Sequence, residues 1–419
     1  MEHIREVYHA VRHYASVFLQ WVMIGLGVGT VVGFCGTGFA YGMKTVTGLR
    51  AQYPWLLFGL PFAGLLIVAI YHFAGLRRHR GTNRVLLSIR TKSKVPFRMA
   101  PAIFVGTLLT HLCGGSAGRE GAALQMGGSI AQQLGRWAKA EERTMHVYTM
   151  CGMSACFAAL FGTPVAAAVF SLEVVSVGIM HYSALVPCSV AALTADTIAR
   201  YFKVGHMGFT VSGMPESFDL LTGGRVCVLA LGCAVVSIIF CVILHKTGHW
   251  YEHCFKNHYV RAFVGGLLII GLTLILQTGD YLSVGERVIE EAVAGNARPE
   301  AFLLKMIFTA LTLEAGYKGG EIVPTLFIGS TFGCVAGGLL GLSPSFGAML
   351  GMVALFCGVT NCPITAICLG MELFGGKGME WMLLASAVSY MLSGYYGLYS
   401  KQKILYSKEA PEFIDATCR

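Results

Sequence analysis

Long apolar runs dominate the pattern of hydrophobic and polar positions along the chain. The runs at 55–73, 226–244 and 263–276 are nearly uncharged. Because about 20 mostly apolar residues span a bilayer as a helix, this pattern predicts an all-α polytopic membrane protein with roughly ten to eighteen helical segments. Other apolar runs are too short or too rich in glycine to form plain spanning helices, which favours the broken and tilted helices of transporters and channels.

The apolar pattern repeats within the chain. The stretch GMSACFAALFGTPVAAAVFSLEV at 152–174 matches GMVALFCGVTNCPITAICLGMEL at 351–373, with a constant separation of 199 residues between matched positions. Glu173 falls opposite Glu372 in this match. Self-similarity at one fixed separation is the signature of an internal repeat.

A second pair of matching blocks lies upstream of the first. GREGAALQMGGS at 118–129 matches GGEIVPTLFIGS at 319–330 at a separation of 201 residues, and Glu120 falls opposite Glu321. Two halves of inverted topology place their binding site near the middle of the membrane, where broken helices from both halves meet. We therefore expect Glu120 and Glu321 to approach one another.

The predicted organisation is an amphipathic helix at 1–16, a first transmembrane repeat at 17–202, an outer connecting loop at 203–222, a second transmembrane repeat at 223–400 and a C-terminal tail at 401–419.

Composition and charge place this protein in a membrane and orient it there. Charged residues make up 13% of the 419 residues, against roughly 25% in soluble domains. The net charge of +9 is uneven: 77–98, 246–261 and 401–419 are basic, whereas 213–224 and 279–300 lean acidic. Because cytoplasmic connections are enriched in Lys and Arg, we predict that the basic stretches and both termini are cytoplasmic, without nucleic-acid binding. The first basic connection contains Arg77, Arg78, Arg80, Arg84, Arg90, Lys92, Lys94 and Arg98.

The distribution of cysteines indicates that they pack in the interior and do not form disulfides or bind metal. The 14 cysteines are scattered singly, without CxxC pairs or histidine partners, and most lie in apolar runs. This pattern predicts reduced, buried thiols in place of a disulfide framework or a metal site. The segment 1–16 mixes His, Arg and apolar positions as an amphipathic helix does, and it lacks the apolar core and cleavage site of a signal peptide.

The stretch GGSAGREG at 114–121 places Arg119 and Glu120 in an apolar region. A helix-compatible run at 122–134 follows, so Glu120 is predicted to lie at a helix N-terminus, where free N–H groups and the helix dipole favour a carboxylate or a bound anion. A mobile carboxylate can occupy the place of an anion and leave it when protonated, which would make Glu120 both gate and proton carrier. The alternatives are a structural Arg119–Glu120 pair and a carboxylate cap. A charge at membrane depth costs about 3 kcal/mol, which favours a functional role.

The same stretch contains a pattern from a different class of protein. Residues 114–118 fit the G-x-S-x-G motif of nucleophilic serines, and His111 lies nearby. An intramembrane serine hydrolase is therefore an alternative. The motif carries meaning only at a strand–turn–helix junction, and an internal repeat gives an enzyme no evident advantage, so the sequence favours a protein without enzyme chemistry.

Three blocks of the sequence resemble the CLC family of anion channels and anion/proton antiporters, over nearly the whole chain. The GREGP block of that family is present as GREGA at 118–122, its GxFxP block as GGEIVP at 319–324, and its tyrosine block as GLYS with Tyr399. The resemblance implies the CLC fold, with two inverted repeats of broken and tilted helices, and a homodimer with one ion pathway per subunit. It implies an anion site lined by Gly118, Arg119, Gly121, Val323 and the hydroxyl group of Tyr399.

Where the sequence departs from the chloride-type blocks, it resembles one clade of the family, the fluoride/proton antiporters. The block GSGIP corresponds to GTNRV at 81–85, and Ala122 replaces the proline of GREGP. Glu321 stands where chloride-type members have an apolar residue, and Val174 stands where proton-coupled chloride members often carry an inner acid. The positions that this resemblance implies for fluoride contact are Thr82 and Asn83, through hydrogen bonds, and Phe327, through its electropositive ring edge.

The implied function is export of fluoride in exchange for protons, across the cell membrane and without a cofactor or metal. Glu120 takes up a proton from outside and swings between the anion site and the proton route, while Glu321 completes the inner part of the cycle. A chloride/proton exchanger or a chloride channel of the same family is the main alternative.

Each of these side chains also has a structural interpretation. Asn83 could cap a short helix that begins near Arg84, and Phe327 could pack or face lipid. Tyr399 could be an interfacial aromatic residue, and Glu321 a buried structural acid. Helix capping or a structural partner would also explain the remaining acids, Glu173, Glu314 and Glu372, and neutralisation of a nearby acid would explain Lys318.

Overall fold

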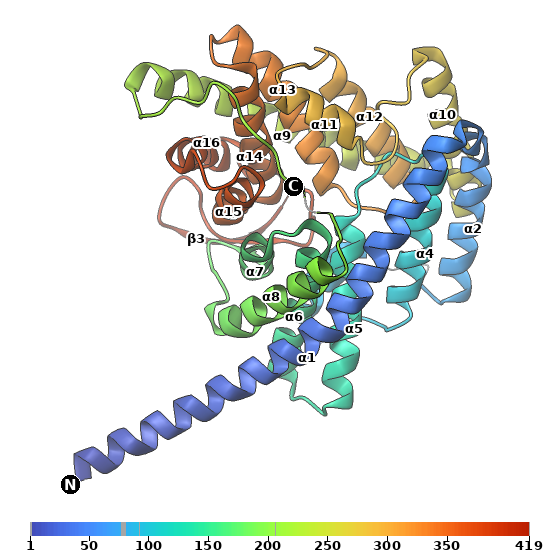
Figure 1. The fold of residues 1–419 in the computed structure, drawn as a ribbon. Coiled ribbons are helices and arrows are strands. Elements are labelled where there is room, and N and C mark those ends of the chain that lie inside the picture. Colours follow the sequence, from blue (N-terminus) through green and yellow to red (C-terminus); the bar gives the residue numbers. More distant parts are fainter. Residues whose placement is uncertain (1, 77–80, 92, 206, 419) are drawn as a thin grey trace.

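Helices make up most of the protein, as its computed structural model shows (Figure 1). The structure describes residues 2–76, 81–91, 93–205 and 207–418. Sixteen α-helices lie in this part of the chain, which confirms the predicted all-α class. Four residues of the first basic connection lie outside the described residues: Arg77, Arg78, Arg80 and Lys92.

The helices differ widely in length, as expected for a fold built from broken helices. Seven helices in the described residues are long and apolar enough to cross a membrane, and they include all three predicted apolar runs. The helices of the first half are α1 Glu2–Gln52, α2 Leu60–Phe73, α3 Gly81–Arg90, α4 Met99–Leu112, α5 Glu120–Trp137, α6 Glu142–Phe161, α7 Pro164–Glu173 and α8 Leu185–Tyr201. Those of the second half are α9 Leu220–Cys254, α10 His258–Leu276, α11 Glu286–Val293, α12 Ala301–Glu314, α13 Ile322–Leu339, α14 Pro344–Thr360, α15 Pro363–Leu373 and α16 Met379–Leu392.

The N-terminal segment is part of a longer helix. α1 runs without a break over 51 residues, so the boundary predicted at residue 16 does not correspond to a helix end. The first turns of α1 extend away from the rest of the protein (Figure 1), and their side chains are almost all exposed. The sequence shows no breaker here, because no proline or glycine lies in the first 24 residues.

Glycines inside the apolar segments allow the same close helix packing in both halves. A Cβ atom added to Gly127 of α5 would overlap the carbonyl oxygen of Gly152 of α6, and one added to Gly329 of α13 would overlap that of Gly351 of α14. Small residues let membrane helices approach this closely. The helix pairs α5–α6 and α13–α14 are therefore equivalent parts of the two repeats.

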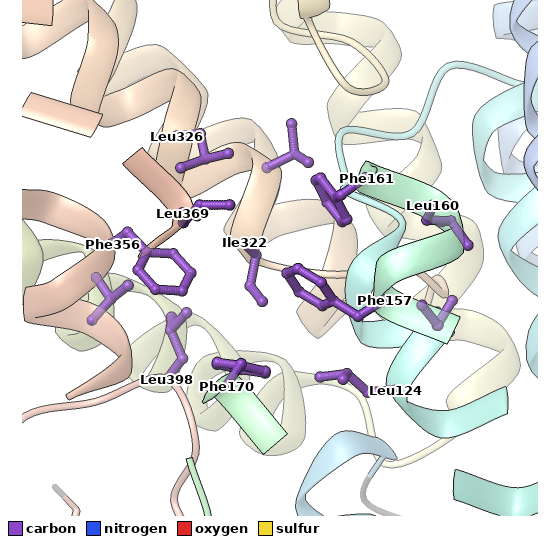
Figure 2. Packing of buried hydrophobic residues seen from close by; sticks show 14 of the residues in the cluster. Leu124, Phe157, Leu160, Phe161, Phe170, Ile322, Leu326, Phe356, Leu369 and Leu398 are labelled. Carbon is purple, nitrogen blue, oxygen red and sulfur yellow. The ribbon is translucent and has the colours of Figure 1, made fainter. Parts of the chain in front are cut away.

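The two repeats share one hydrophobic core. Figure 2 shows Phe157 and Phe170 of the first repeat beside Ile322 and Phe356 of the second. The ring centroids of Phe157 and Phe170 are 5.5 Å apart, and those of Phe170 and Phe356 are 6.2 Å apart. Phe157 and Phe356 are matched positions of the repeat, so this row of rings crosses the boundary between the halves.

A small sheet joins the C-terminal tail to the first repeat, which the sequence analysis did not predict. Strand β1 (Ser176–Val177) pairs in parallel with β2 (Lys403–Tyr406), and β2 pairs antiparallel with β3 (Phe413–Thr417). These strands are too short for a periodic pattern. All fourteen cysteines are free thiols, and ten of them are buried as predicted, whereas Cys35 and Cys254 are exposed.

Candidate functional site

The two glutamate-bearing blocks meet between the halves. The backbone N–H of Gly118 donates to the carbonyl oxygen of Gly320 at 2.7 Å, and the N–H of Gly320 donates to that of Gly118 at 2.8 Å. This bridge brings together the N-termini of α5 and α13, which begin two residues after each glycine. The sequence repeat predicted this meeting of the two blocks.

The carboxylate of Glu120 lies between the two glutamate-bearing blocks. Its Oε1 atom accepts a hydrogen bond of 2.8 Å from the backbone N–H of Val323, in the first turn of α13. Its Oε2 atom is buried without a hydrogen-bond partner among the described residues, and the side chain is fully buried. A Cβ atom at Gly118 or Gly320 would overlap this carboxylate. Glu120 therefore fills a pocket, walled by glycine backbone, at a helix N-terminus that suits an anion.

The neighbouring arginine does not pair with Glu120. The Nη2 atom of Arg119 lies 3.8 Å from Oε1 of Glu286, and its guanidinium group lies 5.7 Å from the ring centroid of Phe161. The alternative of a structural Arg119–Glu120 pair is therefore wrong. The alternative of a cap is correct in one respect: Glu120 binds the first turn of α13, a helix of the opposite repeat.

Glu321 and Tyr399 add further unpaired polar atoms to this site. The Oε2 atom of Glu321 and the hydroxyl group of Tyr399 are both buried without a hydrogen-bond partner within the described part of the chain. The Tyr399 hydroxyl interacts electrostatically with both Glu321 and Glu120. Leaving a buried polar group unsatisfied costs about 1–3 kcal/mol, so this cluster is typical of a site that binds an ion or exchanges a proton.

Thr82 and Asn83 lie on α3, beside the start of α5. The hydroxyl group of Thr82 accepts from Gln125 at 3.4 Å and approaches the carbonyl oxygen of Gly121 at 3.5 Å. The Oδ1 atom of Asn83 accepts from the backbone N–H of Lys401 at 3.0 Å. α3 already includes Gly81, so Asn83 does not cap a helix that begins near Arg84. Instead, it fixes the segment that follows Tyr399.

Phe327 is fully buried, which excludes the lipid-facing interpretation. It lies one turn after Val323 on α13 and packs against Gly285. The ammonium group of Lys305 lies 5.1 Å from the centroid of its ring. Lys305, which the sequence analysis missed, is fully buried and donates to the carbonyl oxygens of Tyr281 and Ser283 at 3.2 and 2.7 Å. A single lysine within an apolar helix was the only available signal.

Glu173 and Glu372 cap helices of the opposite repeat. Glu173 accepts from the backbone N–H groups of Ile364 and Thr365 at 3.1 and 2.8 Å, in the first turn of α15. Glu372 accepts from those of Val165 and Ala166 at 2.9 and 2.8 Å, in the first turn of α7. These reciprocal bonds support the capping interpretation of both acids and join the repeats symmetrically.

We expect Glu173→Ala to lower the free energy of unfolding by more than Glu372→Ala does. Each substitution leaves two helix N–H groups unpaired, at about 1–3 kcal/mol per buried group. Glu173 is more buried and also accepts from the hydroxyl group of Thr365 at 2.6 Å. Unfolding in detergent measures the effect, with the exposed Glu290→Ala as the control. Equal stability of the three variants would contradict the capping role.

The serine motif lacks the geometry of a hydrolase. Ser116 lies in the connection between α4 and α5, not at a strand–turn–helix junction. Its hydroxyl group lies 3.2 Å from that of Thr309, and the Nε2 atom of His111 lies 3.2 Å from the carbonyl oxygen of Gly118. Ser116 and His111 therefore form no nucleophile–base pair in the described structure.

The chain is similar in sequence to ion-transport proteins over most of its length. It matches the model of a family described as voltage gated chloride channel over residues 63–394. A chloride/fluoride channel protein of Pseudomonas syringae pv. tomato is 34% identical over 398 residues, which cover 93% of this chain and 87% of that protein. An H(+)/Cl(-) exchange transporter ClcA of Yersinia pestis bv. Antiqua (strain Angola) is 26% identical over 384 residues, which cover 83% of this chain and 78% of that protein.

Two solved structures resemble the fold. A CLC-type fluoride/proton antiporter superimposes with a TM-score of 0.87 and 31% identity, covering 92% of this chain and 98% of that chain. A slow cyanobacterial Cl⁻/H⁺ antiporter superimposes with a TM-score of 0.77 and 22% identity, covering 89% of this chain and 94% of that chain. These likenesses confirm the predicted fold of inverted repeats.

Proposed function

The chain belongs to the voltage-gated chloride channel family, and on this basis we propose that it exchanges fluoride for protons. The observation that carries the proposal is the position of Glu120, whose carboxylate fills a glycine-walled pocket at the N-terminus of α13. A relative named as a chloride/fluoride channel protein and the similar structure of a CLC-type fluoride/proton antiporter support the choice of ion. The acid at Glu321, in place of an apolar residue, supports it further.

The proposed cycle begins with Glu120 as a carboxylate in the anion pocket. Protonation removes its charge and weakens its bond to the N–H of Val323, so the side chain leaves and fluoride takes its place. The free hydroxyl group of Tyr399 donates a hydrogen bond to the ion. Because fluoride is small and strongly hydrated, its site needs several such donors. The other groups proposed to line its route are Thr82, Asn83, Arg119 and the ring edge of Phe327, with Gly118 and Gly121 providing close backbone approach.

Glu321 is proposed as the second proton-carrying group. It interacts electrostatically with Glu120, and its unpaired Oε2 atom is free to receive a proton. Glu120 then moves the proton inward from the outer side, and Glu321 accepts it as Glu120 returns to the anion pocket.

We further propose that the protein lies in the cell membrane with its basic connections and both termini in the cytoplasm. Proton entry then drives fluoride out of the cell. Many apolar side chains on the helix surfaces are exposed in the single chain, which fits contact with lipid and with a second copy in a homodimer. No enzyme chemistry, metal or cofactor is part of the cycle.

We expect purified protein in liposomes to move fluoride faster than chloride, with protons moving in the opposite direction. A fluoride electrode, a chloride electrode and a pH electrode on the same vesicles measure the three fluxes. The donors around Glu120 favour the smaller and more strongly hydrogen-bonded ion. Faster chloride flux with proton movement would identify a chloride/proton exchanger, and anion flux without protons would identify a channel.

A further inference from the structure

One partly buried acid, Glu314, has no role in the cycle described above. It is the last residue of α12, and a short loop connects it to Glu321. α12 packs against α9 and α10. A Cβ atom added to Gly248 of α9 would lie 2.5 Å from the Oε2 atom of Glu314. The glycine therefore provides the space into which this carboxylate extends.

Charged groups from the neighbouring elements surround Glu314 without fixing it. Lys318 in the following loop lies over Tyr71 of α2, with its Nζ atom 4.4 Å from the ring centroid. Among the described residues, no hydrogen bond or ion pair closer than 4.0 Å holds the Glu314 carboxylate. A purely structural acid would be expected to pair directly, whereas an unfixed one can gain and lose a proton. The charged and titratable groups near it are Arg261 of α10, Glu252 and His249 of α9, Lys318 and Glu321.

Four acids form a series from one face of the protein to the central site. Glu252 is exposed near the end of α9, Glu314 and Glu321 are partly buried, and Glu120 is fully buried. Glu252 lies one helical turn after Gly248, the residue that faces the Glu314 carboxylate. A short loop joins Glu314 to Glu321, and Gly320, directly before Glu321, borders the carboxylate of Glu120. Glu252 lies in the basic stretch 246–261, which the charge pattern assigns to the cytoplasm. The series therefore connects the site to the cytoplasmic face.

The end of α7 offers no comparable group. Glu173 is engaged as a cap of α15, and the following Val174 is fully buried. The carbonyl oxygen of Val174 accepts from the side-chain amide of Gln402 at 3.0 Å. The C-terminal sheet pairs with the chain directly after this position. A proton leaving the site therefore has a titratable group available at Glu314 but not at Val174.

We propose that Glu314 relays the proton between Glu321 and the cytoplasm, an inference that rests on the proposed fluoride/proton exchange. The O–H bond of protonated Glu321 breaks as a bridging water takes up the proton, and this water gives a proton to a carboxylate oxygen of Glu314. Glu314 then releases it to water at the exposed end of α9. Each transfer leaves one neutral acid and one carboxylate, so protons and charge balance without a further reactant. The positive charges of Arg261 and Lys318 stabilise the Glu314 carboxylate after release.

We expect Glu314→Gln to lower the number of protons moved per fluoride by about tenfold or more, the scale of a lost proton-transfer group. Glutamine keeps the size of the side chain but cannot carry a proton. Fluoride continues to move, because Glu120 then takes up and returns its proton on the outer side. Fluoride and pH electrodes on the same liposomes measure the ratio.

Two further variants separate a relay from a structural role. Glu314→Asp keeps a titratable group and should restore part of the coupling. Glu290→Gln makes the same charge change on the exposed side of α11, outside the series of acids, and should leave the ratio unchanged. Normal coupling in Glu314→Gln, equal loss in Glu314→Asp, or equal loss in Glu290→Gln would each overturn the relay. If wild-type protein moves no protons against fluoride, the proposed function itself fails.

Discussion

Glu120→Gln is expected to reduce fluoride-driven proton movement to the level of empty liposomes. Glutamine can still accept the hydrogen bond from the backbone N–H of Val323 that Glu120 accepts at 2.8 Å, so the architecture of the site is preserved. It cannot take up or release a proton, and it carries no charge to compete with the anion at the start of α13. Proton coupling is therefore lost, while fluoride displaces the neutral glutamine side chain more easily than it displaces a carboxylate.

The measurement is proton uptake recorded together with fluoride efflux from the same liposomes. Glu290→Gln serves as the control, because it removes one exposed negative charge on α11 and lies outside the site. Undiminished proton pumping by Glu120→Gln would refute the assignment of Glu120 as gate and proton carrier. A loss of the same size in the control would indicate a general effect of charge.

The sequence predicted the architecture because membrane solvation and the repeat act over long stretches of chain. Apolar runs must be long enough to span lipid, so 55–73, 226–244 and 263–276 all lie in spanning helices. The repeat predicted that Glu120 lies near Glu321, and the hydrogen bonds between Gly118 and Gly320 bring the two blocks together. Local features were harder to predict: α1 continues through residue 16, and the tail forms strands too short to produce a pattern.

Side-chain roles were predictable only where a motif carried them. The expectations for Glu120 and Tyr399 follow from sequence motifs, whereas the capping of α15 by Glu173 depends on a contact between residues far apart in the chain. Lys305 and Glu314 belong to no motif. Their environments are created by the packing of α12 against its neighbours, which a single sequence does not encode in any local pattern.

Gly118→Ala is expected to lower both fluoride and proton flux by about tenfold or more. The added Cβ atom would overlap both carboxylate oxygens of Glu120. The backbone of Gly118 has little freedom to move away, because two hydrogen bonds hold it to Gly320. Overpacking of this kind costs about 1–3 kcal/mol, and 1.4 kcal/mol corresponds to a factor of ten. Since fluoride is proposed to occupy the same place as the carboxylate, neither ion is accommodated normally.

Gly271→Ala is the matched control for this substitution. Its added Cβ atom meets nothing within 4 Å, and the residue lies inside α10, where alanine is well tolerated. Both variants need to elute as folded protein from size-exclusion chromatography before their fluxes are compared. Wild-type flux in Gly118→Ala would show that the space beside Gly118 is not part of the ion route. Selective loss in that variant, with normal flux in Gly271→Ala, would locate the shared site of carboxylate and fluoride between the two glycine-bearing blocks.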